Sequence, residues 1–305
     1  MVAILNKRVV KGVYLTAFLI MMLTGCATIR PGGPGPLDAN SGLTDTVFSH
    51  DKFDAVLSRA VDDRGRVNYR MLKENSNDLD AYLHLVSAFS PDSHPGLFPN
   101  RDHRLAYWIN AYNAYTIKAV LVHYPISSVL DVKTPALAFF LTDKAGFFIF
   151  QRFMFGGATT NLYFLENNVI RKRFKDPRIH FAVNCASIGC PQLPNRAFNG
   201  ELLDAQLDAE TRKFVVEQRN VRVDHGHKTI WLSSIFKWYK SDFSESSLTV
   251  ENEDIASGDI PPLIAYINHY LPPEAAAVLT DAAVSYPIRF VPYDWELNDQ
   301  NRVPK

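Results

Sequence analysis

Apolar side chains recur three and four residues apart over several stretches of the chain, which is the spacing of an amphipathic helix. The clearest stretch is 104–123, where Leu105, Trp108 and Ile109 begin a repeat that continues along one face. Pro125 lies just beyond this stretch and favours an end to the helix. The same spacing, together with candidate capping residues, predicts further helices over residues 48–60, 78–88, 161–174, 202–218, 234–239 and 264–270.

Alternation of apolar and polar residues, the pattern of a half-buried strand, is rarer. It occurs over residues 178–184, where Ile179, Phe181 and Val183 share one face. Other segments predicted to be extended are the arms of a β-hairpin, 221–224 and 229–232, and a last segment at 286–292. Helices and short strands interleave without a regular βαβ order. The pattern therefore predicts one mixed α+β domain over residues 46–305, rich in helix and with a small sheet.

The composition is that of a globular protein. Of 305 residues, 47% are hydrophobic and 21% are charged, which excludes a disordered or collagen-like chain. Basic and acidic residues balance at 32 each. A protein that binds nucleic acid usually carries a basic excess, so we expect no nucleic-acid partner.

The first 25 residues have the pattern of a signal peptide. Lys7, Arg8 and Lys11 form a basic start, and residues 12–22 form an apolar run that is too short to span a bilayer. The sequence Leu-Thr-Gly-Cys that follows, ending at Cys26, resembles the lipobox of bacterial lipoproteins. This resemblance implies removal of residues 1–25 and lipidation of Cys26. An ordinary signal peptide and a short membrane anchor remain the alternatives.

The expected location is the bacterial cell envelope, where the lipidated N-terminus would attach the protein to the membrane as its partner. Residue 27 is Ala, whereas Asp after the lipidated cysteine resembles a signal for retention in the inner membrane. Its absence favours the outer membrane, facing the periplasm. Residues 26–45 are rich in Pro and Gly and are expected to form a flexible, lipid-anchored tether.

Several motifs of the predicted domain resemble one family. They are residues 105–114, with the sequence LAYWINAYNA, residues 176–193, with DPRIHFAVNCASIGCPQL, residues 292–298, with PYDWELN, and a weaker match at 65–69. They resemble the domain of unknown function 547, which is found in bacterial envelope proteins and in plant proteins. Asn68 stands where the family often has Asp. The resemblance implies no established reaction, so function has to be argued from the residues.

Cys185 and Cys190 are the only cysteines that follow Cys26. Outside the cytoplasm a close pair is usually oxidised, which predicts a structural disulfide. The alternative is that Cys185 is a thiol nucleophile with His180 as its base. On a straight strand the side chains of His180 and Cys185 would point to opposite faces, so the chain would have to turn between them. His103 or His123 could serve instead.

Asn110 and Asn113 lie three residues apart on one face of the predicted central helix. One interpretation is a structural hydrogen-bond network that holds loops to the helix. The other is that an amide, Asn110 in the candidate set, orients a catalytic histidine or a substrate carbonyl. The other residues assigned to a structural network or a pocket are Trp108 and, near the C-terminus, Asp294 and Trp295, which are typical of a lid or latch.

No cofactor motif is found, and the Cys-x4-Cys spacing is wider than that of the usual zinc knuckle, so no metal and no cofactor are expected. The first hypothesis is an envelope binding or scaffolding module with an aromatic-lined pocket for an unknown envelope ligand or protein. The second is a Cys–His thiol hydrolase or transferase that acts on an amide or peptide of the envelope.

Overall fold

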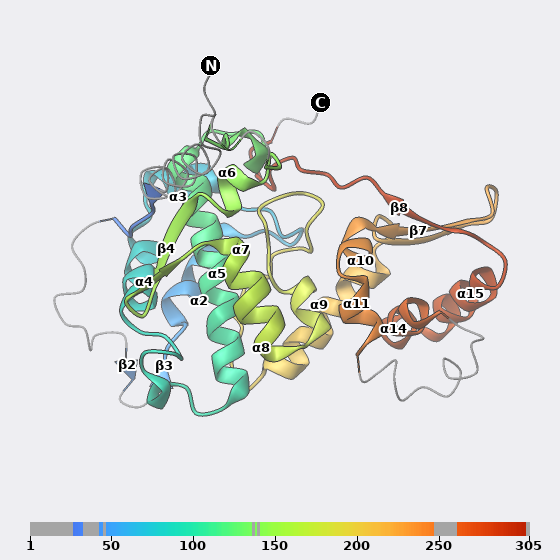
Figure 1. The fold of residues 1–305 in the computed structure, drawn as a ribbon, viewed down its shortest axis with the longest axis horizontal. Helices are drawn as coiled ribbons and strands as arrows, with labels where there is room; N and C mark the ends of the chain where they lie inside the picture. The colour runs from blue at the N-terminus through green and yellow to red at the C-terminus, as the bar shows by residue number, and fades with distance from the viewer. Residues whose placement is uncertain are drawn as a thin grey trace, which may run out of the picture.

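The computed structural model describes residues 27–32, 43–44, 47–135, 138, 141–246 and 261–302. This part of the chain is rich in helix and has small sheets, which confirms the predicted α+β class (Figure 1). The predicted signal peptide and the lipidation site Cys26 lie outside the described residues. Among the described helices, none is both long enough and apolar enough to cross a membrane.

Helix α5 (Arg101–His123) runs through the larger of the apolar clusters (Figure 1). Asn100 caps its start, because the side-chain oxygen accepts hydrogen bonds from the backbone N–H groups of Asp102 and His103. Helices α3 (Tyr69–Glu74), α4 (Asn77–Ala88) and α9 (Leu203–Val216) contact it, and α2 (Asp51–Ala60) packs on α3 and α4. Helices were predicted at all of these places except α3, which Asn68 caps. Because α5 is covered on nearly every side, its polar residues are buried with its apolar ones.

A second apolar cluster is built from the C-terminal half of the chain. The hairpin β6 (Val221–Asp224) and β7 (Thr229–Ser233) is antiparallel, and β8 (Ile288–Val291) adds to β7 in parallel. This confirms the predicted hairpin and the last extended segment. The helices of this cluster are α10 (Ser234–Trp238), α11 (Lys240–Ser244), α14 (Pro262–Tyr270) and α15 (Pro273–Ala283). Helix α15 was not predicted, because the prolines before it also mark a break.

Residues 126–157, a segment rich in phenylalanine for which no strand was predicted, contain one. Strand β4 (Gln151–Phe155) pairs with β5 (Ala158–Thr160), and β1 (Ala27–Thr28) adds to β4 in parallel. Ile29 continues this pairing, since its N–H donates to the carbonyl of Arg152 at 2.8 Å, and its side chain is buried. The start of the segment expected to be a tether therefore lies on the domain, and residues 33–42 of that segment lie outside the described residues. Other short elements of the described chain are β2 (Leu43–Thr44), β3 (Val47–Phe48), η1 (Pro95–Leu97), η2 (Val129–Asp131) and α6 (Ala145–Phe148).

The helix predicted over residues 161–174 is present, with a wider turn in its middle. Asn161 caps it by accepting a hydrogen bond from the N–H of Phe164. It consists of α7 (Leu162–Phe164), the π-helix η4 (Leu165–Arg171) and α8 (Lys172–Phe174). In a π-helix the hydrogen bonds join residues five apart, and such segments are frequent at functional sites.

The prediction of a strand over residues 178–184 is wrong. The segment is the 3₁₀-helix η5 (Pro177–Phe181), followed by a turn. Pro177 occupies the first helical position, and the side chain of Asp176 accepts a hydrogen bond from the N–H of Arg178. The alternating pattern arises because Ile179 packs on the larger apolar cluster while Phe181 packs on the second. The parity argument against a meeting of His180 and Cys185 therefore does not apply.

Candidate functional site

A cavity of about 360 Å³ lies where η4, η5, α10 and the C-terminal segment 292–297 approach α5 and α6. We call it the aromatic pocket. Its aromatic lining consists of Tyr112, Phe148, Tyr163, Trp238, Tyr239, Tyr293 and Trp295. Its charged or polar lining includes Lys144, Glu166, Asn167, Arg171 and His180. The pocket is therefore a mainly aromatic cavity with a few polar groups, which is the usual make-up of a ligand site.

Three aromatic rings form one side of the aromatic pocket. The ring centroids of Trp238 and Tyr293 are 4.8 Å apart, those of Tyr293 and Trp295 are 4.5 Å apart, and the two indoles are 6.0 Å apart. The Nζ atom of Lys144 lies 4.3 Å from the ring centroid of Trp238 and 4.4 Å from that of Trp295. Burial lowers the pKa of Lys144, although the nearby carboxylate of Glu166 acts in the opposite direction.

Glu166 is hydrogen-bonded to two tyrosine hydroxyls in the polar part of the aromatic pocket. Its carboxylate accepts hydrogen bonds from the hydroxyl of Tyr239 at 2.5 Å and from that of Tyr112 at 3.3 Å. Burial, and then the charge of Glu166, raise the pKa of both tyrosines well above the usual range. Both hydroxyls therefore stay protonated and donate to a charged carboxylate.

His180 lies behind this group and is paired with Asp242. Its Nε2 is 2.8 Å from Asp242 Oδ2, and its ring stacks on Tyr239 with 3.8 Å between the centroids. Arg171 donates to both oxygens of the same carboxylate, at 2.9 and 3.0 Å. Burial would raise the pKa of Asp242, but the hydrogen bonds from His180 and Arg171 bring it well below its usual value.

The state of His180 follows from its burial. Burial lowers the pKa of His180, although the hydrogen bond to Asp242 acts in the opposite direction. A neutral imidazole next to a charged carboxylate carries its proton on the nitrogen that faces the acceptor, which here is Nε2. His180 is thus a buried, oriented imidazole in the wall of the aromatic pocket.

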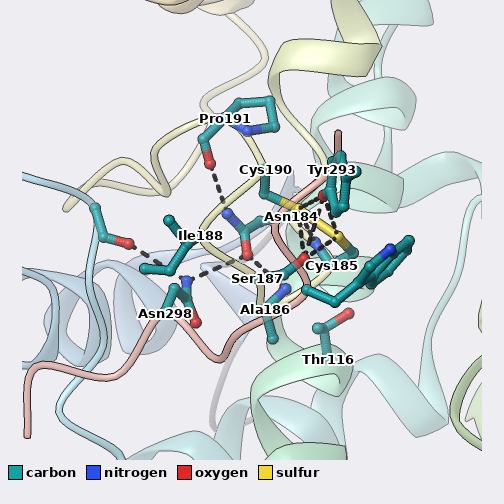
Figure 2. Close-up of a disulfide and its surroundings, with 12 residues drawn as sticks. Thr116, Asn184, Cys185, Ala186, Ser187, Ile188, Cys190, Pro191, Tyr293 and Asn298 are labelled. Carbon is teal, nitrogen blue, oxygen red and sulfur yellow. Dashed lines mark hydrogen bonds between the residues drawn. A yellow bond between two sulfur atoms is a disulfide. The ribbon is translucent and has the colours of Figure 1, made fainter. Parts of the chain in front are cut away.

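Cys185 and Cys190 form a disulfide that lines the aromatic pocket (Figure 2). The hydroxyl of Tyr293 lies 2.9 Å from Cys185 Sγ and 3.1 Å from Cys190 Sγ, and the backbone N–H of Cys185 donates to Cys190 Sγ at 2.9 Å. Ser187 Oγ lies 3.0 Å from Cys185 Sγ. This geometry supports the predicted disulfide. The thiol alternative for Cys185 would need the bond to be reduced first.

The loop between the cysteines is held by Asn184. Its side chain donates to the carbonyl of Pro191 at 2.7 Å and accepts from the N–H of Ala186 at 2.8 Å (Figure 2). Ala186 has a φ of 63°, a left-handed conformation that residues with a Cβ seldom adopt, so the hydrogen bond to Asn184 compensates a local strain. Gly189 comes so close to the C-terminal segment that a Cβ there would lie 2.9 Å from the carbonyl of Asp294.

Asp294 and Trp295 belong to a segment that runs antiparallel to this loop and is hydrogen-bonded to it. The carbonyl of Asp294 accepts from Gly189, and its side chain accepts from the N–H of Glu296 at 2.9 Å. Trp295 lines the aromatic pocket, and its carbonyl accepts from Ser128 Oγ. Asp294 thus shapes a turn, while Trp295 contributes a ring to the cavity.

Asn110 and Asn113 hold loops to helix α5. Asn110 donates to the carbonyl of Phe198 at 2.8 Å and accepts from its N–H at 3.0 Å. Asn113 donates to the carbonyl of Ala182 at 2.9 Å and accepts from the N–H of Asn184 at 2.8 Å. Both side chains are buried, with exposed fractions of 0% and 2%. This geometry supports the network interpretation, and neither amide lines the aromatic pocket.

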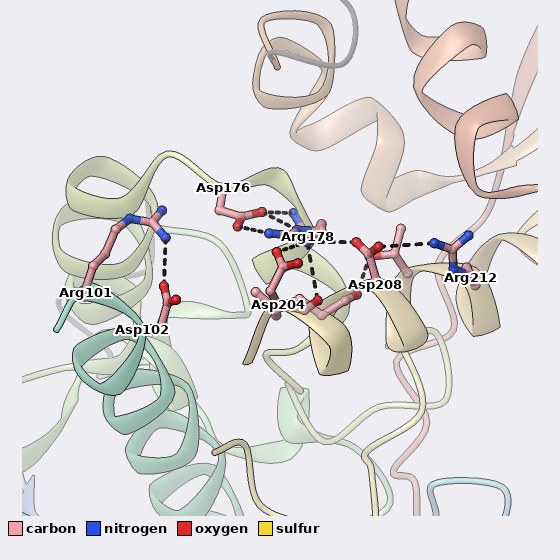
Figure 3. Close-up of polar contacts among 9 residues, drawn as sticks. Arg101, Asp102, Asp176, Arg178, Asp204, Asp208 and Arg212 are labelled. Carbon is pink, nitrogen blue, oxygen red and sulfur yellow. Dashed lines mark hydrogen bonds and ion pairs between the residues drawn. The ribbon is translucent and has the colours of Figure 1, made fainter. Parts of the chain in front are cut away.

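The predicted residue Trp108 and an ion-pair cluster around Arg178 lie outside the aromatic pocket. Trp108 is 4% exposed and lines a separate groove beside Phe155. An ion-pair cluster fixes the start of η5 to α9, since Arg178 pairs with Asp176, Asp204 and Asp208 (Figure 3). Within the described ranges, no three His, Cys, Asp or Glu side chains come close enough to share a metal ion.

Sequence reasoning missed four polar residues of the pocket wall, Lys144, Glu166, Arg171 and Tyr239, and also Asp242, which pairs with His180 and Arg171. Only Glu166 and Arg171 left a signal, a charged pair five residues apart within a predicted helix. In η4 the wider turn places residues five apart on one side, so both line the pocket. The π-helix itself carries no recognisable sequence pattern.

Comparison with known proteins gives a family for part of the chain. Residues 98–215 match the model of the family described as "Protein of unknown function, DUF547", so a DUF547-like domain lies in this part of the chain. This confirms the resemblance carried by the motifs at 105–114 and 176–193. Trp238, Tyr293 and Trp295 lie outside the matched residues. No curated protein and no solved structure matches this chain.

Proposed function

We propose that this chain, which carries a DUF547-like domain over residues 98–215, is a lipid-anchored envelope protein that binds a ligand in the aromatic pocket. The observation that carries the proposal is the pocket itself, about 360 Å³ in volume and lined by aromatic rings around a few oriented polar groups. Cavities of this size and lining are typical of sites for small molecules or for a side chain of a partner.

A binding role fits the chemistry of the pocket better than thiol catalysis. The sulfur of Cys185 is bonded to Cys190, so it has no thiolate to offer. The Nε2 of His180 is engaged by Asp242. One observation favours the alternative, a Cys–His thiol hydrolase or transferase acting on an envelope amide or peptide: His180 and Cys185 line the same cavity. That activity would require the disulfide to be reduced.

The binding role can be tested with a neutral aromatic dye, N-phenyl-1-naphthylamine, whose fluorescence rises in apolar surroundings. We expect saturable binding to the full chain, and an affinity about tenfold lower in Trp238→Ala, because a ring is removed from the pocket wall. Trp231→Ala is the matched control, since Trp231 lies on β7 and does not line the pocket. Equal loss in both variants, or no saturable signal in the wild type, would contradict the proposal.

The anchor is a separate part of the proposal and is supported by the basic start, the short apolar run and the lipobox that ends at Cys26. We expect the wild type to sediment with membranes after a high-salt wash and Cys26→Ser to appear in the soluble fraction. Thr28→Ser, which leaves the lipobox intact, serves as the control. A Cys26→Ser protein that still sediments would show that another feature holds it. With Ala27 after the cysteine, we propose the outer membrane, facing the periplasm.

A further inference from the structure

The aromatic pocket already holds a cation that belongs to the chain. The ammonium of Lys144 lies over two indole rings, those of Trp238 and Trp295, at 4.3 and 4.4 Å from their centroids. The ring of Tyr293 packs against both indoles and completes an aromatic cage, which we define as Trp238, Tyr293 and Trp295. Cations are attracted to the faces of aromatic rings, and most strongly to indole.

The charges around the cage also suit a cation. Glu166 lines the same pocket, and its negative charge acts on Lys144. The positive charge of Arg171 is compensated by Asp242, because Arg171 donates to both oxygens of that carboxylate. His180, which also lines the pocket, donates to Asp242, and the hydroxyls of Tyr112 and Tyr239 donate to Glu166. A cage of indoles with one carboxylate nearby is the arrangement that favours an ammonium group over a neutral or anionic one.

The position of Lys144 allows its ammonium group to move out of the aromatic cage into water. It lies at the N-terminal end of the four-residue helix α6, next to the exposed residues Thr142 and Asp143. Its side chain is long and flexible, and no ion pair among the described residues involves it. Because burial disfavours its charged form, moving the ammonium into water recovers hydration. Exchange with a ligand ammonium leaves the charge of the pocket unchanged.

We propose that the aromatic pocket takes ligands that carry an ammonium group, and that Lys144 is an internal occupant which such a ligand displaces. This inference rests on the proposed binding function and names the chemical class of its ligand. A quaternary ammonium is the favoured form, because it is more weakly hydrated than a primary one and loses less on entering the cage. The inference concerns the cation itself, which a lipid headgroup and a free amine present alike.

The experiment compares choline with 3,3-dimethylbutan-1-ol, its uncharged carbon analogue, by titration of tryptophan fluorescence in the full chain. We expect choline to bind about tenfold more tightly than the analogue, since only choline gains the attraction of the rings and of Glu166. Lys144→Ala is expected to strengthen choline binding about tenfold, while Lys144→Arg, which keeps a competing cation, is not. Lys172→Ala removes an exposed charge outside the pocket lining and is the charge-matched control.

Two further variants separate the cage from the carboxylate. Trp295→Phe keeps an aromatic ring that attracts cations less strongly than indole does. We therefore expect it to weaken choline binding more than binding of the neutral analogue. Glu166→Gln keeps an acceptor for Tyr112 and Tyr239 and should lower the affinity for choline only. Equal binding of choline and its analogue, or no effect of Lys144→Ala, overturns this inference and leaves the binding function in place. Failure of both choline and the naphthylamine dye to bind overturns both proposals.

Discussion

Replacing Asn113 by alanine is expected to lower the free energy of unfolding by about 3 kcal/mol. The side chain satisfies two buried backbone groups, the carbonyl of Ala182 and the N–H of Asn184, and alanine can satisfy neither. A buried polar group left without its partner costs roughly 1–3 kcal/mol. The lost hydrogen bonds hold the segment between η5 and the cysteine loop, so the substitution also loosens one wall of the aromatic pocket.

Denaturant midpoints at constant slope measure this effect. Asn77→Ala is the matched control, because Asn77 is an exposed residue of α4 and its replacement should change stability by less than about 0.5 kcal/mol. Asn110→Ala should resemble Asn113→Ala, since Asn110 makes the same pair of bonds to Phe198. A midpoint for Asn113→Ala equal to that of Asn77→Ala would mean that water replaces the amide and that the network stabilises nothing.

The sequence predicted best where one local signal decided the structure. Helix α5 has a long run of helical spacing, a capping residue at Asn100 and a proline just beyond its end, and it is found with nearly the predicted bounds. The hairpin of β6 and β7 has two short apolar arms and a glycine in its turn. Helix α10 was predicted over residues 234–239, and the side chain of Ser233 caps it by accepting a hydrogen bond from the N–H of Ile235. Each of these depends on neighbours within a few residues.

The prediction failed where packing between distant parts decided the structure. Residues 178–184 alternate as a strand would, yet they form η5 and a turn, because their apolar side chains are divided between two clusters rather than placed on two faces of a sheet. Strand β4 lies in a segment dense in phenylalanine, whose apolar run has no period. Its partners Ala27 and Thr28 come from a segment that composition alone assigned to a tether.

The candidate site shows the same division. Asn110, Asn113 and the two cysteines could be singled out, because polar or reactive side chains within apolar stretches are conspicuous. Trp295 was singled out as well, but the cage could not be, because Trp238 and Trp295 are far apart in the chain and their rings are 6.0 Å apart in the fold. Lys144 reaches them from a third segment, and nothing in its neighbourhood marks it as a pocket residue. The pocket is a product of tertiary structure, so its chemistry became visible only there.

The disulfide leads to the other large effect. In the Cys26→Ser protein, only Cys185 and Cys190 remain of three cysteines, and we expect no titratable thiol after denaturation without reductant. Closing a loop of this length stabilises the fold by about 2 kcal/mol through the entropy of the unfolded chain. Cys185→Ser should therefore lower the free energy of unfolding by about that amount. Wild-type protein measured in a reductant should fall to the same level, which makes it the matched control for the substitution.

The thiol count also separates the two functions. In the oxidised form the pocket presents two bonded sulfurs beside the hydroxyl of Tyr293, and ligand binding should not depend on either of them as a nucleophile. If the denatured, unreduced protein instead reacts with two equivalents of a thiol reagent, Cys185 carries a free sulfur in the wall of a cavity that it shares with His180. The thiol hydrolase or transferase would then be the better account. His180→Gln would be its first test, because that substitution removes the base and leaves the aromatic cage untouched.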